Sequence, residues 1–205
     1  MRRIDKGNPI PSFVAFVKAH PHAKWKDSEG VRHLWREYIW EHEQHRLSGY
    51  TEKPIRLDSS HIDHFRKQSL FHTLVFDWPN LIVDGIDETY GAKFKDGFIK
   101  NASDNEKLID PVKEDAARFF KYELSGKISV ADNLNDVDKA RAAFTIEAFN
   151  LNEGSLKECR KRIMNIIWDS YRDLSDEMIV NVLEAEGFRS VVEQVLKERK
   201  IEDGL

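Results

Sequence analysis

The sequence predicts an α+β protein in which helices lie before and after a central irregular segment. Apolar residues recur at helical spacing up to residue 47 and again after Asn135. Between Ser48 and about Lys100 this period is lost, and short apolar runs alternate with Gly, Pro and Asp. Because loop-rich segments on a rigid scaffold tend to carry function, we expect the functional site in the central segment.

We divide the chain into three parts, residues 1–47, 48–104 and 105–205. The first part is expected to form helices at 11–19 and at about 29–47. A hairpin is expected near 118–130, around a Ser-Gly turn. The helices expected after it are 136–149, 155–171, 176–186 and 188–199. Ser155 and Glu158 have the spacing of a capping box, which places a helix start at Ser155.

The composition limits which functions are compatible with the chain. It has 205 residues, of which 40% are hydrophobic and 33% charged, with a formal net charge of -4. A protein that binds nucleic acid tightly by itself usually has a basic surface, so the negative net charge argues against a stand-alone, high-affinity nucleic-acid-binding protein. It remains compatible with a nuclease that receives its substrate from a partner.

Cysteine usage and hydropathy indicate the compartment. Cys159 is the single cysteine of the sequence, so neither a disulfide framework nor a cysteine zinc site can form within one chain. No apolar run approaches the ~20 residues of a membrane helix. The first residues lack the apolar core of a signal peptide. We therefore expect a cytoplasmic protein that has no membrane partner.

Side chains suited to metal-assisted phosphodiester cleavage gather in the central segment. They are His61-Ile62-Asp63-His64, Asn80 and Asp87-Glu88. A hard cation such as Mg²⁺, with Mn²⁺ as an alternative, prefers oxygen ligands, which Asp63 and Asp87 can supply. A neutral imidazole such as His64 can take the proton of an attacking water, and Asn80 can orient that histidine or brace its loop.

Residue types alone leave the roles of the two histidines open. Asp63 and His64 are adjacent, so they point to opposite faces of a regular strand. They can share a site only where the strand bends or the metal sits at its edge. His61 and Asp63 share a face and are the simpler pair of co-ligands, with Glu88 as a further candidate. Each of these residues also has a plain interpretation as a surface or turn side chain.

Several stretches of the sequence resemble one family of bacterial nucleases. Residues 43–55 are similar to its EQHGLCAYCE-x-x-I segment, and residues 61–66 match HIDHFR of its HIDHFRPK element. Asn80-Leu81 matches its NL, and residues 91–94 match the closing GDKF or GAKF. Residues 110–128 resemble its downstream DP…F-x-Y…G-x-I pattern. The family is that of the PtuB-like HNH nucleases, and the resemblance covers most of residues 40–155.

The resemblance implies a ββα-metal fold for the central part, flanked by N-terminal and C-terminal helices. It implies that Asp63 binds the metal and that His64 is the general base. The middle asparagine of the motif falls on Asn80, and its third position falls near Asp87. His61 is left without an assigned role.

The sequence departs from the family at the positions of its structural zinc. Ser48 and Thr51 replace the first cysteine pair, and the second pair is absent near Gly85-Ile86. We therefore expect no structural zinc and a hairpin held by apolar packing. The side chains expected to provide that packing are Tyr50, Ile55, Phe65, Phe76 and Trp78.

The resemblance also implies a function and partners. Family members act with a PtuA-like ATPase in Septu anti-phage systems and in certain retrons, where a reverse transcriptase and its msDNA are further partners. We expect a metal-dependent endonuclease acting on DNA, with RNA such as tRNA as an alternative substrate. A non-catalytic scaffold for the ATPase assembly is the second alternative. The candidate phosphate contacts are Arg66 and Lys93, followed by Lys67 and Lys95.

Overall fold

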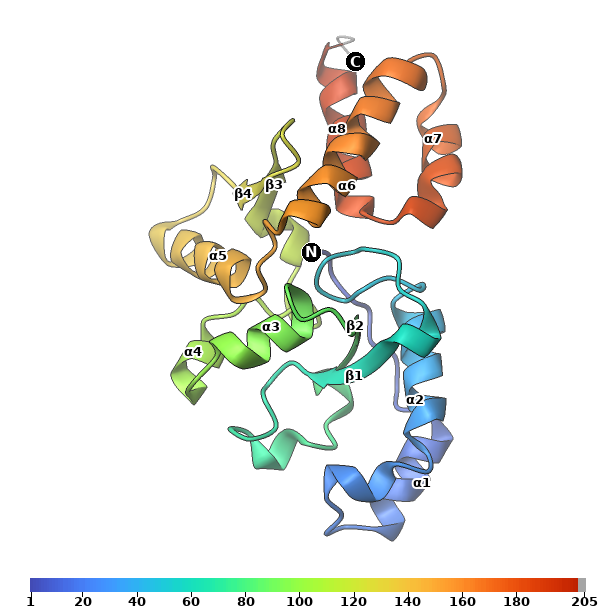
Figure 1. The fold of residues 1–205 in the computed structure, drawn as a ribbon, viewed down its shortest axis with the longest axis vertical. Helices are drawn as coiled ribbons and strands as arrows, with labels where there is room; N and C mark the ends of the chain where they lie inside the picture. The colour runs from blue at the N-terminus through green and yellow to red at the C-terminus, as the bar shows by residue number, and fades with distance from the viewer. Residues whose placement is uncertain (203–205) are drawn as a thin grey trace.

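The computed structural model describes residues 1–202 and confirms the α+β class (Figure 1). Its α-helices are α1 (Pro11–Ala19), α2 (Arg32–Tyr38), α3 (Gly91–Phe98), α4 (Ala102–Glu106), α5 (Asp136–Ala148), α6 (Gly154–Asn165), α7 (Asp176–Leu183) and α8 (Arg189–Glu202). Its strands are β1 (Ser60–His64), β2 (Leu81–Gly85), β3 (Phe120–Tyr122) and β4 (Ile128–Val130). None of the helices within residues 1–202 is long and apolar enough to cross a bilayer.

The helix expected at 29–47 is shorter than its apolar pattern suggests. Helix α2 continues as a π turn over Ile39–Glu43 and stops there. His45 and Arg46 then take positive φ angles of 53° and 66°, a conformation that ends a right-handed helix. Glu43 stabilises the end because its buried carboxylate accepts hydrogen bonds from Lys6 and from the Trp78 indole. Tertiary contacts therefore end the helix before the helical spacing of apolar residues does.

The C-terminal elements follow the sequence pattern closely, with one correction. The hairpin expected near 118–130 is confirmed by the antiparallel pair β3–β4. The predicted capping box at Ser155 is wrong, because α6 begins at Gly154. The Glu153 carboxylate caps it by accepting from the backbone amides of Ser155 and Leu156. Glu153 performs the same capping chemistry two residues earlier.

Strands β1 and β2 form a two-stranded antiparallel sheet in which Asp63 lies opposite Ile82 and His61 opposite Asp84. Helix α3 follows β2 and packs against it. In the part of the chain that the structure describes, β2 is the only strand bonded to β1. The other edge of β1 is therefore free, and this edge positions the candidate site.

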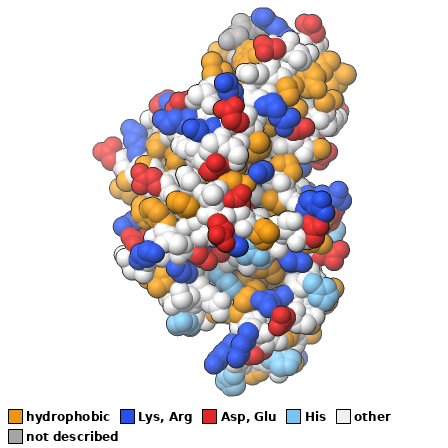
Figure 2. Space-filling model, viewed as in Figure 1, with side chains coloured by type: hydrophobic (Ala, Val, Ile, Leu, Met, Phe, Trp, Pro, Cys, Tyr) orange, Lys and Arg blue, Asp and Glu red, His pale blue; other side chains and the backbone are white. Residues whose placement is uncertain are grey.

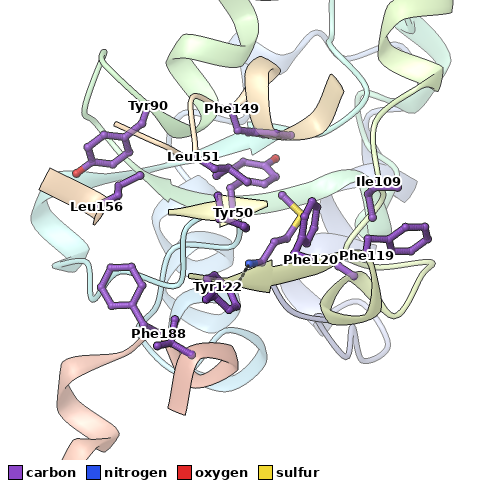
Figure 3. Packing of buried hydrophobic residues seen from close by; sticks show 14 of the residues in the cluster. Tyr50, Tyr90, Ile109, Phe119, Phe120, Tyr122, Phe149, Leu151, Leu156 and Phe188 are labelled. Carbon is purple, nitrogen blue, oxygen red and sulfur yellow. Dashed lines mark hydrogen bonds between the residues drawn. The ribbon is translucent and has the colours of Figure 1, made fainter. Parts of the chain in front are cut away.

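The sheet separates two apolar clusters. Ile82 faces the larger one, in which the Tyr50 ring lies 4.3 Å from that of Phe149 (Figure 3). Leu81 and Val83 face the smaller one, built around Trp35 from α2. Of the five residues expected to hold the hairpin, Tyr50 and Phe65 belong to the larger cluster, and Trp78, Ile55 and Phe76 to the smaller one. The predicted apolar packing is confirmed.

Candidate active site

All four residues of the His61-Ile62-Asp63-His64 segment line one cavity of about 450 Å³. The other side chains that line it are Lys67, Gln68, Ser69, His72 and Asp96. Neighbouring strand residues point to opposite faces, so they can share a cavity only where the strand bends or at a strand edge. The edge of β1 that no other described strand covers meets the second condition.

Asp63 is a buried carboxylate that has two donors. Its side chain is 3% exposed, and its Oδ2 accepts from the Tyr50 hydroxyl at 2.5 Å and from the Lys95 ammonium at 2.7 Å. Burial alone would raise the pKa of Asp63, but the positive charge of Lys95 and these hydrogen bonds outweigh it and lower that pKa. Asp63 is thus held as an anion. Burial and the nearby charge of Asp63 raise the pKa of Tyr50, which remains a donor.

Lys95 was a candidate phosphate contact, but its ammonium is buried and already paired. Its side chain is 0% exposed, and its Nζ also bonds the His64 carbonyl at 2.8 Å and Asp96 Oδ1 at 3.1 Å. The ammonium thereby links both site residues of β1 to helix α3. The helical spacing of Lys95 from the buried Gly91 and Ile99 was a signal that it faces the core.

His64 points away from Asp63, toward the loop that follows β1. Its Nε2 lies 3.0 Å from the Val75 carbonyl, and its ring meets the edge of Trp25 at 4.5 Å between centroids. Burial lowers the pKa of His64, which favours the neutral ring at neutral pH. A neutral ring that donates through Nε2 has its proton acceptor at Nδ1. This is the arrangement that a general base requires.

Asn80 braces the loop between the two strands. Its Oδ1 accepts from the Arg66 amide at 2.6 Å, and its Nδ2 donates to the carbonyls of Arg66 and Leu74. Of the two roles considered for Asn80, these bonds correspond to loop bracing. Because Val75 follows Leu74, Asn80 also fixes the carbonyl that orients His64.

The structure does not bring Asp87 to Asp63. Asp87 is exposed, accepts hydrogen bonds from Thr89, and lines a different hollow, together with Ser48 and Asp84. The pairing of Asp63 and Asp87 as metal ligands is therefore not supported by this geometry. The separation has a simple cause, since Asp63 lies near the C-terminal end of β1 and Asp87 follows the opposite end of the hairpin, beyond Gly85.

Of the remaining predicted residues, Glu88, Lys93 and Arg66 also lie outside the cavity lining. Glu88 is exposed and pairs with Lys93 at 3.4 Å on the surface. The Arg66 guanidinium donates to the Asn105 carbonyl at 3.1 Å. Lys67 does line the cavity, although its Nζ bonds the carbonyls of Asp96 and Ile99 at the end of α3.

Hydrogen bonds join the segments that carry the replaced cysteine positions. The Ser48 hydroxyl donates to Asp84 and accepts from the amide of Thr51. The second Asp84 oxygen accepts from the Ala92 amide at 2.7 Å. Gly91 has a φ of 73°, and any Cβ there would collide with the Asp84 carboxylate. This network connects residue 48, strand β2 and the start of α3.

The cavity offers an incomplete set of protein ligands for a divalent cation. Within residues 1–202, no three His, Cys, Asp or Glu side chains lie close enough to hold a metal. Asp63 and Asp96 nevertheless line one cavity, and His61 has a buried Nδ1 without a hydrogen-bond partner among the described residues. Mg²⁺ is commonly held by one or two carboxylates, with water and phosphate oxygens filling the other positions. The donor set fits that mode of binding.

Histidine side chains gather in the lower part of the face shown in Figure 2, where Figure 1 places α1, α2 and the loop after β1. Basic and acidic side chains are interspersed among them. Neither a scan against protein-family models nor a search of curated proteins finds a match to this chain.

Proposed function

We propose that this chain is an HNH-type nuclease that hydrolyses phosphodiester bonds in nucleic acid with the aid of a divalent cation. The observation that carries the proposal is that His64, whose ring is oriented by the Val75 carbonyl, lines one open cavity with the buried, ion-paired Asp63. The order β1, β2, α3 supports a ββα-metal module, as the family resemblance implies.

The chain's own residues account for the proton transfer that activates the attacking water. His64 Nδ1 accepts a proton from a water molecule, and the resulting hydroxide attacks phosphorus. The bond from phosphorus to the leaving oxygen breaks, and that oxygen takes a proton from solvent. Asp63 and Asp96 would hold the cation, with His61 as a further donor. Such a cation stabilises the charge that develops on the phosphate and on the leaving oxygen.

We further propose that the chain is the effector subunit of an anti-phage complex with a PtuA-like ATPase. The resemblance supports this partner, and the sequence lacks a GxxxxGK[ST] phosphate loop of its own. The net charge of -4 also favours delivery of the substrate by a partner.

One observation favours the second candidate, a non-catalytic scaffold. The Lys95 ammonium already neutralises Asp63 and bridges it to Asp96, where a cation would be held. In a scaffold this ion pair would be purely structural. In a nuclease, the free Asp63 Oδ1 and the half-exposed Asp96 leave room for a cation next to the ammonium.

The direct test is cleavage by the purified full chain, alone and with its co-encoded ATPase. Supercoiled plasmid and tRNA are incubated with Mg²⁺, with Mn²⁺ or with a chelator. We expect cleavage that needs the metal and falls by about 10²–10⁴-fold in His64→Ala, the typical contribution of a general base. The matched control is His22→Ala, because His22 is an exposed histidine outside the cavity lining.

The outcomes separate the candidates. Full cleavage by His64→Ala contradicts the nuclease mechanism. Absence of metal-dependent cleavage in every preparation, with retained binding to the ATPase, supports the scaffold. The preferred polymer distinguishes DNA from RNA, since the hydrolytic chemistry does not depend on the sugar.

A further inference from the structure

A second hollow of about 360 Å³ adjoins the catalytic cavity. Both are lined by His61 and Ile62, so they meet at the free edge of β1. The second hollow is otherwise lined by the segment before α2 and by α2 itself, through Trp25, Glu29, Arg32, His33 and Arg36. We refer to the two hollows together as the β1 groove; Asp63 and His64 line its first hollow.

The charges in this second hollow are suited to an anion. Among residues 1–202, neither Arg32 nor Arg36 forms an ion pair with a carboxylate. Glu29 is the single acidic residue that lines the hollow. Arg36 donates to the Ser60 carbonyl at 2.9 Å, and its buried Nε has no partner among the described residues. The hollow therefore has two guanidinium groups for one carboxylate.

Arg32 is the better placed of the two for direct binding. Its guanidinium lies over the Trp25 ring, 5.2 Å from the centroid, and the same indole contacts the His64 ring at 4.5 Å between centroids. Stacking on an aromatic ring restricts the guanidinium and leaves its N–H groups free to donate. Trp25 thus holds a phosphate-binding group at a fixed position next to the proposed general base.

We propose that a nucleic-acid strand lies along the free edge of β1 and that Arg32, supported by Arg36, binds a phosphate neighbouring the scissile one. The proposal rests on the proposed nuclease function and names its substrate-binding surface. A strand cut at His64 carries a further phosphate on each side of the scissile one, because a phosphate follows every nucleotide. Arg32 lies where one of these neighbouring phosphates could reach it. Arg66 and Lys93 play no part in this contact, since neither lines the groove.

The test measures binding separately from cleavage. The full chain carrying His64→Ala is titrated with fluorescein-labelled single-stranded DNA, single-stranded RNA and duplex DNA in Mg²⁺, and fluorescence anisotropy gives Kd. Adding Arg32→Gln should raise Kd about tenfold, the effect of losing one charge-assisted hydrogen-bond pair. The slope of log Kd against log salt should fall by about one. Arg32→Lys should restore part of the affinity.

The matched control is Arg118→Gln. Arg118 lines neither hollow and pairs with Asp138 at 3.7 Å, so this variant removes one positive charge outside the groove. Circular dichroism confirms that each variant is folded. An unchanged Kd in Arg32→Gln, an equal loss in Arg118→Gln, or no binding of any probe by the parent overturns the proposal. Binding is measured independently of cleavage, so the two proposals can fail separately. If the wild type cuts nucleic acid but Arg32→Gln binds normally, the phosphate subsite is refuted and the proposed nuclease function stands.

Discussion

Asp63 and Asp84 are two buried aspartates on one small sheet, and their pKa values move in opposite directions. Asp84 is opposite His61, and Asp63 is two positions further along β1. Burial raises the pKa of Asp84 to about 6, although Ser48 and the Ala92 amide donate to it. The pKa of Asp63 is lowered, since the charge of Lys95 and the hydrogen bonds from Lys95 and Tyr50 together outweigh the effect of burial. The main difference between the two environments is the Lys95 ammonium, which pairs with Asp63 and not with Asp84.

The comparison sets the proposed active site against a structural aspartate. The Asp84 carboxylate is fully satisfied, because each of its oxygens has a donor. Around Asp63, His61 Nδ1 has no partner among the described residues, and His64 Nδ1 remains an acceptor. Unsatisfied polar groups next to a fixed charge in a cavity are typical of sites that bind or react.

Removing the ammonium should produce the largest effect on folding. Lys95→Met leaves the Asp63 charge buried with Tyr50 as its remaining donor. We expect a loss of roughly 3–5 kcal/mol in the free energy of unfolding, as found for broken buried ion pairs. Urea denaturation measures it. The double variant Lys95→Met, Asp63→Asn should recover much of the loss, since no charge is then stranded.

The matched control is Lys93→Met on the same helix, where the lysine is exposed and its pair with Glu88 is worth little. Its effect should stay within about 0.5 kcal/mol. Mg²⁺ should raise the melting temperature of Lys95→Met more than that of the wild type if a cation can take the place of the ammonium. Equal stability of the two single variants would show that Asp63 does not depend on Lys95.

The pH dependence of stability should reveal Asp84. A folded-state pKa of about 6, above the usual 3.8, means that the folded protein binds this proton more tightly than the unfolded chain. The stabilisation is fully present below about pH 3.8 and is lost as pH rises through 6. The loss is about 3 kcal/mol at most, because one pKa unit corresponds to ~1.36 kcal/mol.

The measurement compares the wild type with Asp84→Asn by urea denaturation at several pH values from the acid to the neutral range. The wild type should lose stability relative to Asp84→Asn as the pH rises, and other titrating groups cancel in the difference. Parallel pH profiles for the two proteins would show that Asp84 ionises without penalty.

The smallest effect is expected at Asp87, the residue that the motif suggested as a metal ligand. Its exposed carboxylate bonds Thr89 and lines the hollow on the Asp84 side. Asp87→Asn should change the free energy of unfolding by less than about 0.5 kcal/mol and leave the metal dependence of cleavage unaltered. A raised metal requirement in this variant would place the metal near Asp87 after all.

Much of the fold could be predicted because it depends on local patterns. The apolar period located α5 to α8 to within a few residues, and a turn between short apolar runs located the β3–β4 hairpin. The adjacency of Asp63 and His64 guarantees that they stay together in any fold. What the sequence determined by itself is thus the set of elements and one contiguous pair of site residues.

The rest was decided by contacts between distant segments. The free edge of β1 lets both faces of one strand share a cavity, and it exists because β2 is the only strand bonded to β1 within residues 1–202. Lys95 reaches Asp63 from α3, Arg32 reaches the groove from α2, and the hairpin carries Asp87 away from its expected partner. The secondary-structure propensity of a segment does not specify which distant side chains it will contact. Their positions follow from burial of the two apolar clusters on either face of the sheet, which only the tertiary structure specifies.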